Sequence, residues 1–321
     1  MALSIQKIAI VGVTGTIGAY LTQALLAKNR FIITAISRQD SKAEIPPTLQ
    51  IARVDYNDHD SVTEAMKSHD ALIITTSVWT PKKTSEKLIK AAAAAGIPWI
   101  LPNEFCMYNT EEAADSIIGP SKKQDRKLIE SLGVSSWIGI SCGFWYEYSL
   151  SNGELYGIDT NKREVKFFDD GTQRLNTSTW PQVGRAVAAV LSLPVDQQGA
   201  QTSLRAYRNC MVYVTSFTIN QKEMLESVKR VTGTTNGDWN ITSEPAKRHY
   251  EIACESLKNG DRVAFGQKLY TRYFYGDAGL FEKLHGLDNE KLWLPKEDLD
   301  ESTKEAVMFA QDGYWAKHSQ Y

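Results

Sequence analysis

The residues whose spacing points most directly to a chemical task are three glycines near the start of the chain, Gly12, Gly15 and Gly18. They follow residues 7–11, an apolar run typical of a short buried strand, and they open a stretch with an apolar stripe at helical spacing. In this context the first glycine permits a tight turn, the second lets backbone approach a pyrophosphate, and the third lets helix and strand pack closely. The free N–H groups at the helix start would then face the phosphates. The pattern predicts a dinucleotide site; a glycine turn that binds no ligand is the alternative.

The end of the expected second strand indicates which dinucleotide the turn would bind. The sequence there reads Ser37-Arg38, with Lys42 four residues further on. An acidic residue at this place would hydrogen-bond the ribose 2′-OH of NAD, whereas a guanidinium suits the 2′-phosphate of NADP and can bind it bidentately. We therefore expect NADPH/NADP+ as the cofactor, with a merely solvated Arg38 as the alternative.

Loops at the ends of the other expected strands extend this site. Asp55 follows the third strand, where it could meet the adenine, and Thr75 and Thr76 end the fourth strand, on the ribose–nicotinamide side. The full predicted cofactor set is Gly12, Thr14, Gly15, Thr16, Ile17, Gly18, Arg38, Lys42, Asp55, Thr75, Thr76, Asn103 and Phe105.

The elements that must position these residues alternate along the first 145 residues. Expected strands cover residues 7–11, 31–37, 49–54, 71–76, 99–102 and 136–140. Expected helices follow the glycine turn, follow Asp60 as an N-cap, and cover residues 83–95 and 122–132. This alternation predicts an α/β fold, a doubly wound parallel sheet (Rossmann) that forms an NADP-binding core over residues 1–150.

After residue 145 the rhythm changes. We expect a hairpin from residues 164–168 and the turn Asp169-Asp170-Gly171, a helix over 181–191, and a last core strand near 211–217. Helical patterns follow over residues 221–231, 246–257, 262–273 and 302–316. Residues 151–321 are thus predicted to form a smaller, mainly helical C-terminal lobe that binds substrate. No flexible linker separates the two parts, so we expect them to share one cleft.

Composition narrows the classes of function. A net charge of -2 argues against a nucleic-acid partner, because proteins that bind nucleic acid usually carry an excess of Lys and Arg to neutralise its phosphates. The four cysteines, Cys106, Cys142, Cys210 and Cys254, are widely spaced, and without HExxH or clustered histidines a metal site has little support. No apolar run approaches a membrane span and no signal peptide is evident, so a cytoplasmic location is expected.

These motifs resemble the NmrA-like, isoflavone-reductase-like family, an atypical branch of the short-chain dehydrogenase/reductases. The resemblance rests on Gly12-Val-Thr-Gly15-Thr-Ile-Gly18, on Arg38, on Leu101-Pro-Asn-Glu-Phe105 and on Ser141-Cys-Gly-Phe-Trp-Tyr146. It covers essentially the whole chain, is specific only in the first half, and in later segments is most similar to fungal members. Family members include plant reductases of phenolic substrates, which transfer hydride from NADPH and use a lysine after the fifth strand as general acid/base.

The resemblance implies which lysine this is. Counted back from Gly133, Lys122 falls on the family's catalytic position, in the expected first turn of a helix. The helix N-terminus and the cations Lys123 and Arg126 would favour the loss of its proton. None of the fourteen tyrosines has a lysine four residues later, so the Tyr-based relay of the main branch is absent. A solvated Lys122 is the alternative, with Lys123 as the second candidate.

The sequence also departs from the family. The family's Pro-Ser-Glu-Phe-Gly appears as Pro102-Asn-Glu-Phe-Cys106, so plant substrates are not assumed. Asn103 could offer its amide to a substrate carbonyl, Phe105 could pack beside the nicotinamide or in the core, and Cys106 is more typical of a small buried side chain. After the sixth strand come four aromatic residues that would line the mouth of the cleft or hold the lobe in place: Phe144, Trp145, Tyr146 and Tyr148.

Together these features predict an NADPH-dependent reductase of an aromatic, phenolic or polyketide-type small molecule, monomeric or homodimeric. Two alternatives stay open: a non-catalytic NADP-sensing regulator of the NmrA type, and a non-redox isomerase or dehydratase on the same fold.

Overall fold

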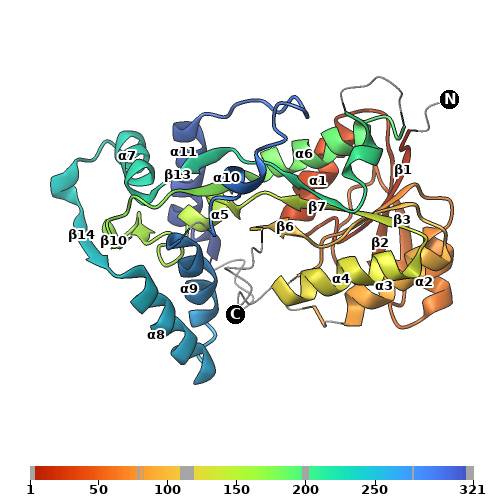
Figure 1. The fold of residues 1–321 in the computed structure, drawn as a ribbon, viewed down its shortest axis with the longest axis horizontal. Coiled ribbons are helices and arrows are strands. Elements are labelled where there is room, and N and C mark those ends of the chain that lie inside the picture. Colours follow the sequence, from red (N-terminus) through yellow and green to blue (C-terminus); the bar gives the residue numbers. More distant parts are fainter. Residues whose placement is uncertain are drawn as a thin grey trace.

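A parallel sheet organises the first half of the chain in the computed structural model (Figure 1). The structure describes residues 4–77, 80–81, 83–108, 119–196, 202–276 and 278–315. Seven strands follow the order β12-β7-β5-β4-β1-β2-β3, and β6 pairs with β7 in addition. All of these pairings are parallel. The strands are β1 (Lys7–Val11), β2 (Ile32–Arg38), β3 (Gln50–Val54), β4 (Ala71–Ile74), β5 (Trp99–Leu101), β6 (Phe105–Cys106), β7 (Ser136–Ser141) and β12 (Cys210–Tyr213).

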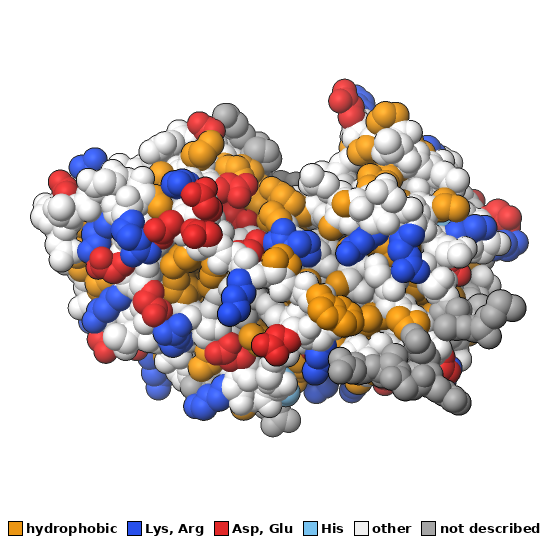
Figure 2. Space-filling model, turned by 90° about the horizontal axis from the view of Figure 1, so that it is seen from above, with side chains coloured by type: hydrophobic (Ala, Val, Ile, Leu, Met, Phe, Trp, Pro, Cys, Tyr) orange, Lys and Arg blue, Asp and Glu red, His pale blue; other side chains and the backbone are white. Residues whose placement is uncertain are grey.

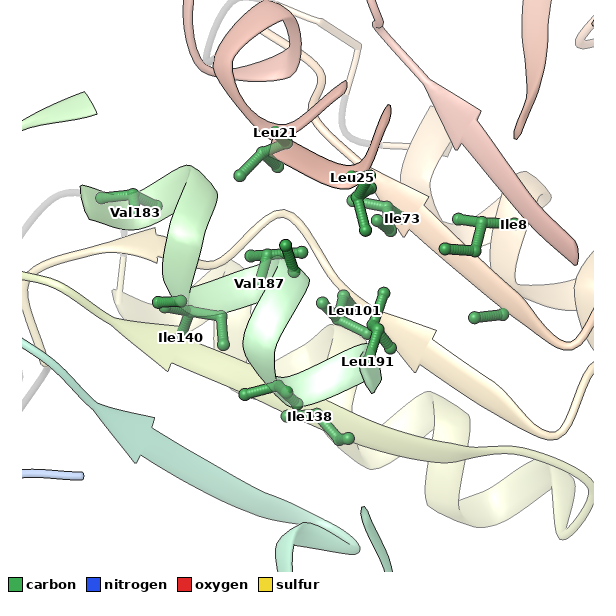
Figure 3. Close-up of a cluster of buried hydrophobic side chains, with 14 of the residues drawn as sticks. Ile8, Leu21, Leu25, Ile73, Leu101, Ile138, Ile140, Val183, Val187 and Leu191 are labelled. Carbon is green, nitrogen blue, oxygen red and sulfur yellow. The ribbon is translucent and has the colours of Figure 1, made fainter. Parts of the chain in front are cut away.

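Helices cover both faces of this sheet, as the near-continuous apolar strands require. One face packs on α1 (Thr16–Leu26) and α6 (Trp180–Ser192), and Figure 3 shows Leu21, Leu25, Val187 and Leu191 lying over strand residues such as Ile138. The other face packs on α2 (His59–Met66), α3 (Lys83–Ala94) and α4 (Gly119–Leu132). The doubly wound architecture is therefore confirmed.

The rest of the chain forms a second packed unit with its own core. Two three-stranded sheets, β14-β10-β9 and β13-β11-β8, lie among its helices. The strands are β8 (Phe144–Trp145), β9 (Ile158–Asp159), β10 (Glu164–Phe168), β11 (Leu175–Ser178), β13 (Phe217–Ile219) and β14 (Asn240–Glu244). The α-helices are α5 (Tyr146–Leu150), α7 (Gln221–Thr232), α8 (Ala246–Lys258), α9 (Ala264–Thr271), α10 (Phe281–His285) and α11 (Leu299–Gln311). Short 3-10 helices cover Leu204–Tyr207, Asn236–Asp238 and Arg272–Phe274.

The two units interleave along the chain. Helix α6 and strand β12 follow residue 150, yet Trp180, Val183 and Val212 belong to the core beneath α1. Helix α6 lies beside α1, where Gly184 meets the backbone of Tyr20 so closely that an added Cβ would lie 2.7 Å from its carbonyl oxygen. The sheet unit thus needs elements from both halves of the sequence.

Two local expectations are wrong. The turn at Asp169 does not close a hairpin, because β10 pairs antiparallel with the preceding β9 and parallel with the distant β14. Asp169 instead donates its N–H to the carbonyl oxygen of Glu244 and accepts the N–H of Ala246, which ties the turn to the start of α8. The N-cap of α2 is Asp58 rather than Asp60, because its Oδ1 accepts the N–H groups of Asp60 and Ser61.

Candidate cofactor and catalytic site

A cleft of about 860 Å³ opens where the parallel strands end. Its walls include residues 11–15 at the end of β1 and beyond it, 36–41 at the end of β2 and beyond it, 54–57 at the end of β3 and beyond it, and 75–77 after β4, together with the start of α3. Open α/β sheets bind ligands at this edge, outside the carboxyl ends of the strands. The cleft therefore lies where the glycine motif predicts a cofactor.

Each glycine of the turn is required for a different structural reason. Gly12 has φ +90°, and a Cβ there would lie 2.3 Å from the carbonyl oxygen of Thr75. A Cβ on Gly18 would lie 2.0 Å from the carbonyl oxygen of Gly12, so this glycine lets α1 pack against the turn. Gly15 has no such neighbour, with its nearest contact at 3.4 Å, and it lines the cleft as the N-cap of α1. The backbone N–H groups of the first turn of α1 are thus left for an anion.

Thr75 joins the turn to the end of β4. Its hydroxyl lies 2.9 Å from the carbonyl oxygen of Val11 and 3.0 Å from that of Gly12, and it donates to this pair. Asn103, which follows β5, makes a similar link to the end of β4. Its side-chain amide donates to the carbonyl oxygen of Thr76 at 2.6 Å. Asn103 therefore shapes the cleft from outside its lining.

The Arg38 guanidinium stands at the rim of the cleft. Its side chain is 62% exposed, and its Nε lies 3.7 Å from an Asp40 carboxylate oxygen. The loop behind it is fixed by Arg53, whose Nη1 donates to the carbonyl oxygens of Arg38 and Ser41 at 3.3 and 2.9 Å. The loop is thereby held by a second arginine, and the exposed Arg38 head group has the Asp40 carboxylate beside it.

Seven predicted cofactor residues line the cleft and six do not. The lining contains Gly12, Thr14, Gly15, Arg38, Asp55, Thr75 and Thr76. The others are Thr16, Ile17, Gly18, Lys42, Asn103 and Phe105. Of these, Ile17 and Phe105 are buried in the core beneath α1 and α6, Phe105 at 3% exposure.

Sequence reasoning placed Asp55 at the cleft but missed two side chains near it, Tyr56 and Lys87. Tyr56 lines the cleft and donates its hydroxyl to the carbonyl oxygen of Ile36 at 3.2 Å, and burial raises the pKa of Tyr56 to about 12. Lys87 of α3 donates to Asn57 at 2.6 Å. The signal that points to these residues is topological, since loops after neighbouring parallel strands meet at one edge.

Lys122 lies in α4, beyond β5 and β6. Lys122 is half-buried, whereas its neighbour Lys123 is exposed, so the two candidates differ in their exposure to solvent. Its charge lowers the pKa of Glu104, of Asp125 and of Cys106, each of which burial raises. Lys122 is not among the residues that line the described cleft, and Lys123 is exposed to solvent.

The four predicted substrate aromatics pack into the protein. Phe144 stacks on Tyr270 with ring centroids 3.8 Å apart, and fully buried Tyr146 shares a hydrogen bond of 2.7 Å with Thr303. Trp145 and Tyr148 pack around Trp180. None of the four is among the residues that line the described cleft. The phenyl ring of Phe144 and the phenol of Tyr146 thus pack within the lobe, which is the second of the two alternatives given for these residues.

The face drawn in Figure 2 intersperses basic and acidic side chains. In the described ranges no three His, Cys, Asp or Glu side chains gather as a metal ion would need. None of the helices in those ranges has both the length and the apolarity to cross a bilayer.

Comparisons with known proteins agree with this geometry. A family model described as the NmrA-like family matches residues 4–300. The chain is 27% identical to the oxidoreductase aprR of Aspergillus flavus over 304 residues, 92% of this chain and 96% of that protein. Among solved structures, an isoflavone reductase superimposes with a TM-score of 0.74 at 19% identity, covering 95% of this chain and 100% of its own. AtPrR2 with NADP+ and (+)pinoresinol gives a TM-score of 0.69 at 16% identity, covering 95% and 99%.

Proposed function

The chain belongs to the NmrA-like family, and from that premise we propose that it is an NADPH-dependent reductase of an aromatic or polyketide-type small molecule. The observation that carries the proposal is the cleft itself, which the glycine turn and Arg38 both line. The relative from Aspergillus flavus bears the name oxidoreductase, and a protein of the same fold was solved with NADP+ and an aromatic ligand.

The residues at the cleft fit a dinucleotide with a 2′-phosphate. The Gly15 Cα leaves the turn open, so pyrophosphate oxygens can accept the N–H groups that begin α1. The exposed Arg38 guanidinium can form charge-assisted hydrogen bonds to the 2′-phosphate, which NAD lacks. Asp55 and Tyr56 border the adenine side, and Thr75 and Thr76 the ribose–nicotinamide side.

Lys122 is the proton donor in this proposal. NADPH supplies the hydride when bound, and a carbonyl or enolate oxygen that gains electron density needs a proton. The Lys122 ammonium can give one and then recover it from solvent, as a general acid does. Lys123 is exposed and serves as its natural control.

The test is NADPH oxidation with a panel of phenolic, quinone and polyketide substrates. We expect Lys122→Ala to lose turnover by about 100-fold or more while its NADPH affinity stays within twofold of wild type. Lys123→Ala keeps both. Tight NADPH binding with no oxidation by any member of the panel would contradict the reductase and favour the sensor alternative.

A further inference from the structure

Three side chains on one wall of the cleft are joined in a row by hydrogen bonds. The Lys87 ammonium on α3 donates to Oδ1 of Asn57 at 2.6 Å. The side-chain amide and the backbone N–H of Asn57 donate in turn to Oδ1 of Asp55, at 3.1 and 2.9 Å. All three residues line the cleft. The row therefore links α3 to the loop that follows β3.

Lys87 fixes the direction of the hydrogen bonds in this row. A lysine ammonium can only donate, so it takes the oxygen of the Asn57 side chain. The amide nitrogen of Asn57 is then turned toward the Asp55 carboxylate, to which it donates. Without the ammonium, the amide could turn over and present its oxygen to Asp55, and two acceptors would then face each other.

The Asp55 carboxylate has one oxygen left for a ligand. Its Oδ1 accepts both N–H groups of Asn57, whereas its Oδ2 has no hydrogen bond to another residue of the ranges that the structure describes. Asp55 is exposed at the wall of the cleft. An ionised carboxylate accepts hydrogen bonds and donates none, so Oδ2 suits a ligand group that carries hydrogen atoms.

The base of the proposed cofactor has such a group. Arg38 ends β2 and would hold the 2′-phosphate, and β3, which Asp55 follows, is the next strand of the sheet. The base on that ribose would then lie at the ends of β2 and β3, beside Asp55. The exocyclic amine of adenine is a hydrogen-bond donor, whereas a 6-oxo purine has an acceptor at the same position.

We propose that Lys87 is a positioning residue, which turns the Asn57 amide so that Asp55 presents its free oxygen to the exocyclic amine of adenine. The inference rests on the proposed cofactor and adds what selects its base. Lys87 acts through Asn57 and does not contact the base itself. The row thus makes α3 part of the device that distinguishes adenine from a 6-oxo purine.

The test compares two coenzymes of equal charge, NADPH and its hypoxanthine analogue deamino-NADPH, by calorimetric titration without substrate. Because both carry the same phosphates, loss of a cation weakens them equally, and only the ratio of their dissociation constants reports the base. We expect wild type to bind NADPH about tenfold more tightly than the analogue. Asp55→Asn is expected to bring this ratio to about one, and Lys87→Met to lower it about threefold. Lys90→Met is the matched control and keeps the wild-type ratio, because Lys90 pairs with Glu86 on α3 and does not line the cleft.

Three results would overturn the proposal. Equal binding of the two coenzymes by wild type would show that the base is not selected. An unchanged ratio in Asp55→Asn would assign this carboxylate to another part of the coenzyme, such as a ribose hydroxyl. An unchanged ratio in Lys87→Met would show that α3 does not act on the base. Binding of neither coenzyme would reject the cofactor itself, whereas the expected ratios in a protein that never oxidises NADPH would support the role of Lys87 and reject the reductase.

Discussion

Gly15 and Gly18 are three residues apart in one turn but meet different surroundings. Gly18 lies against the carbonyl oxygen of Gly12, whereas Gly15 faces the cleft with its nearest contact at 3.4 Å. Gly18→Ala is expected to lower the free energy of unfolding by about 2 kcal/mol or more, because backbone would have to move. Gly15→Ala is expected to change it by less than about 1 kcal/mol yet weaken NADPH binding at least about tenfold, since the methyl narrows the phosphate turn.

Urea denaturation and a fluorescence titration with NADPH check this pair. Equal loss of stability in both variants would contradict the separate roles of these glycines.

The proposed function assigns to Arg38 the preference for a 2′-phosphate. Arg38→Ala is expected to weaken NADPH binding by about 10- to 100-fold, the worth of a charge-assisted hydrogen bond, and to leave NADH binding unchanged. Lys42→Ala is the matched control, because Lys42 does not line the cleft. Calorimetric titration of both coenzymes gives the result, and parallel losses for NADPH and NADH would show that Arg38 does not read the phosphate.

At the scale of elements, α5 and α6 meet at a buried carboxyl group. Glu147 is 1% exposed and accepts the N–H of Trp180, the first residue of α6, at 3.3 Å from each oxygen. Burial, with Glu305 and Glu297 nearby, raises its pKa from 4.5 to about 8. The folded protein therefore retains a proton at Glu147 that the unfolded chain loses above about pH 4.5.

The sign of the stability change follows. Between pH 4.5 and 8 the folded state binds more protons, so this group makes the free energy of unfolding fall as pH rises, by at most about 1.4 kcal/mol per pH unit. Glu147→Gln is expected to remove this slope, to match wild type near pH 4.5 and to exceed it above pH 8. Urea denaturation at several pH values measures it, with exposed Glu301→Gln as control; parallel curves for wild type and Glu147→Gln would refute the buried acid.

Elements of the sheet unit were predictable because each carries a local signal. Strand β1 runs over the expected residues 7–11, and β4 and β5 are shorter than expected by a residue or two. The signal failed where pairing is between distant segments: nothing near residue 168 indicates that β10 would pair with β14, more than 70 residues away. At the cleft, the spacing of the turn glycines and the place of Arg38 after the second strand predict their positions. The positions of Tyr56 and Lys87 depend on how the loops and α3 come together in space, which the sequence pattern does not show.

The placement of the aromatic residues shows the same limit. Phe144 and Tyr146 follow the end of a strand. At such a place, an aromatic residue that contacts a ligand and one that packs in the core look the same in the sequence. Only the arrival of Tyr270 and Thr303, over 100 residues later, fills the space around them.

At the scale of the whole molecule, the sheet unit forms the cleft at the strand ends, and Lys122 on α4 lies outside the lining of that cleft. The second unit packs against the sheet unit where Trp145 and Tyr148 contact Trp180 of α6. Figure 1 shows the two units side by side. In the proposed reductase, the substrate must therefore reach both the cofactor in the cleft and the Lys122 amine.

Isothermal titration of the wild-type protein with NADPH and with NADH tests the central claim most directly. The account predicts one NADPH per chain, bound at least about tenfold more tightly than NADH. Absence of binding for both coenzymes, in protein that unfolds cooperatively, would contradict it.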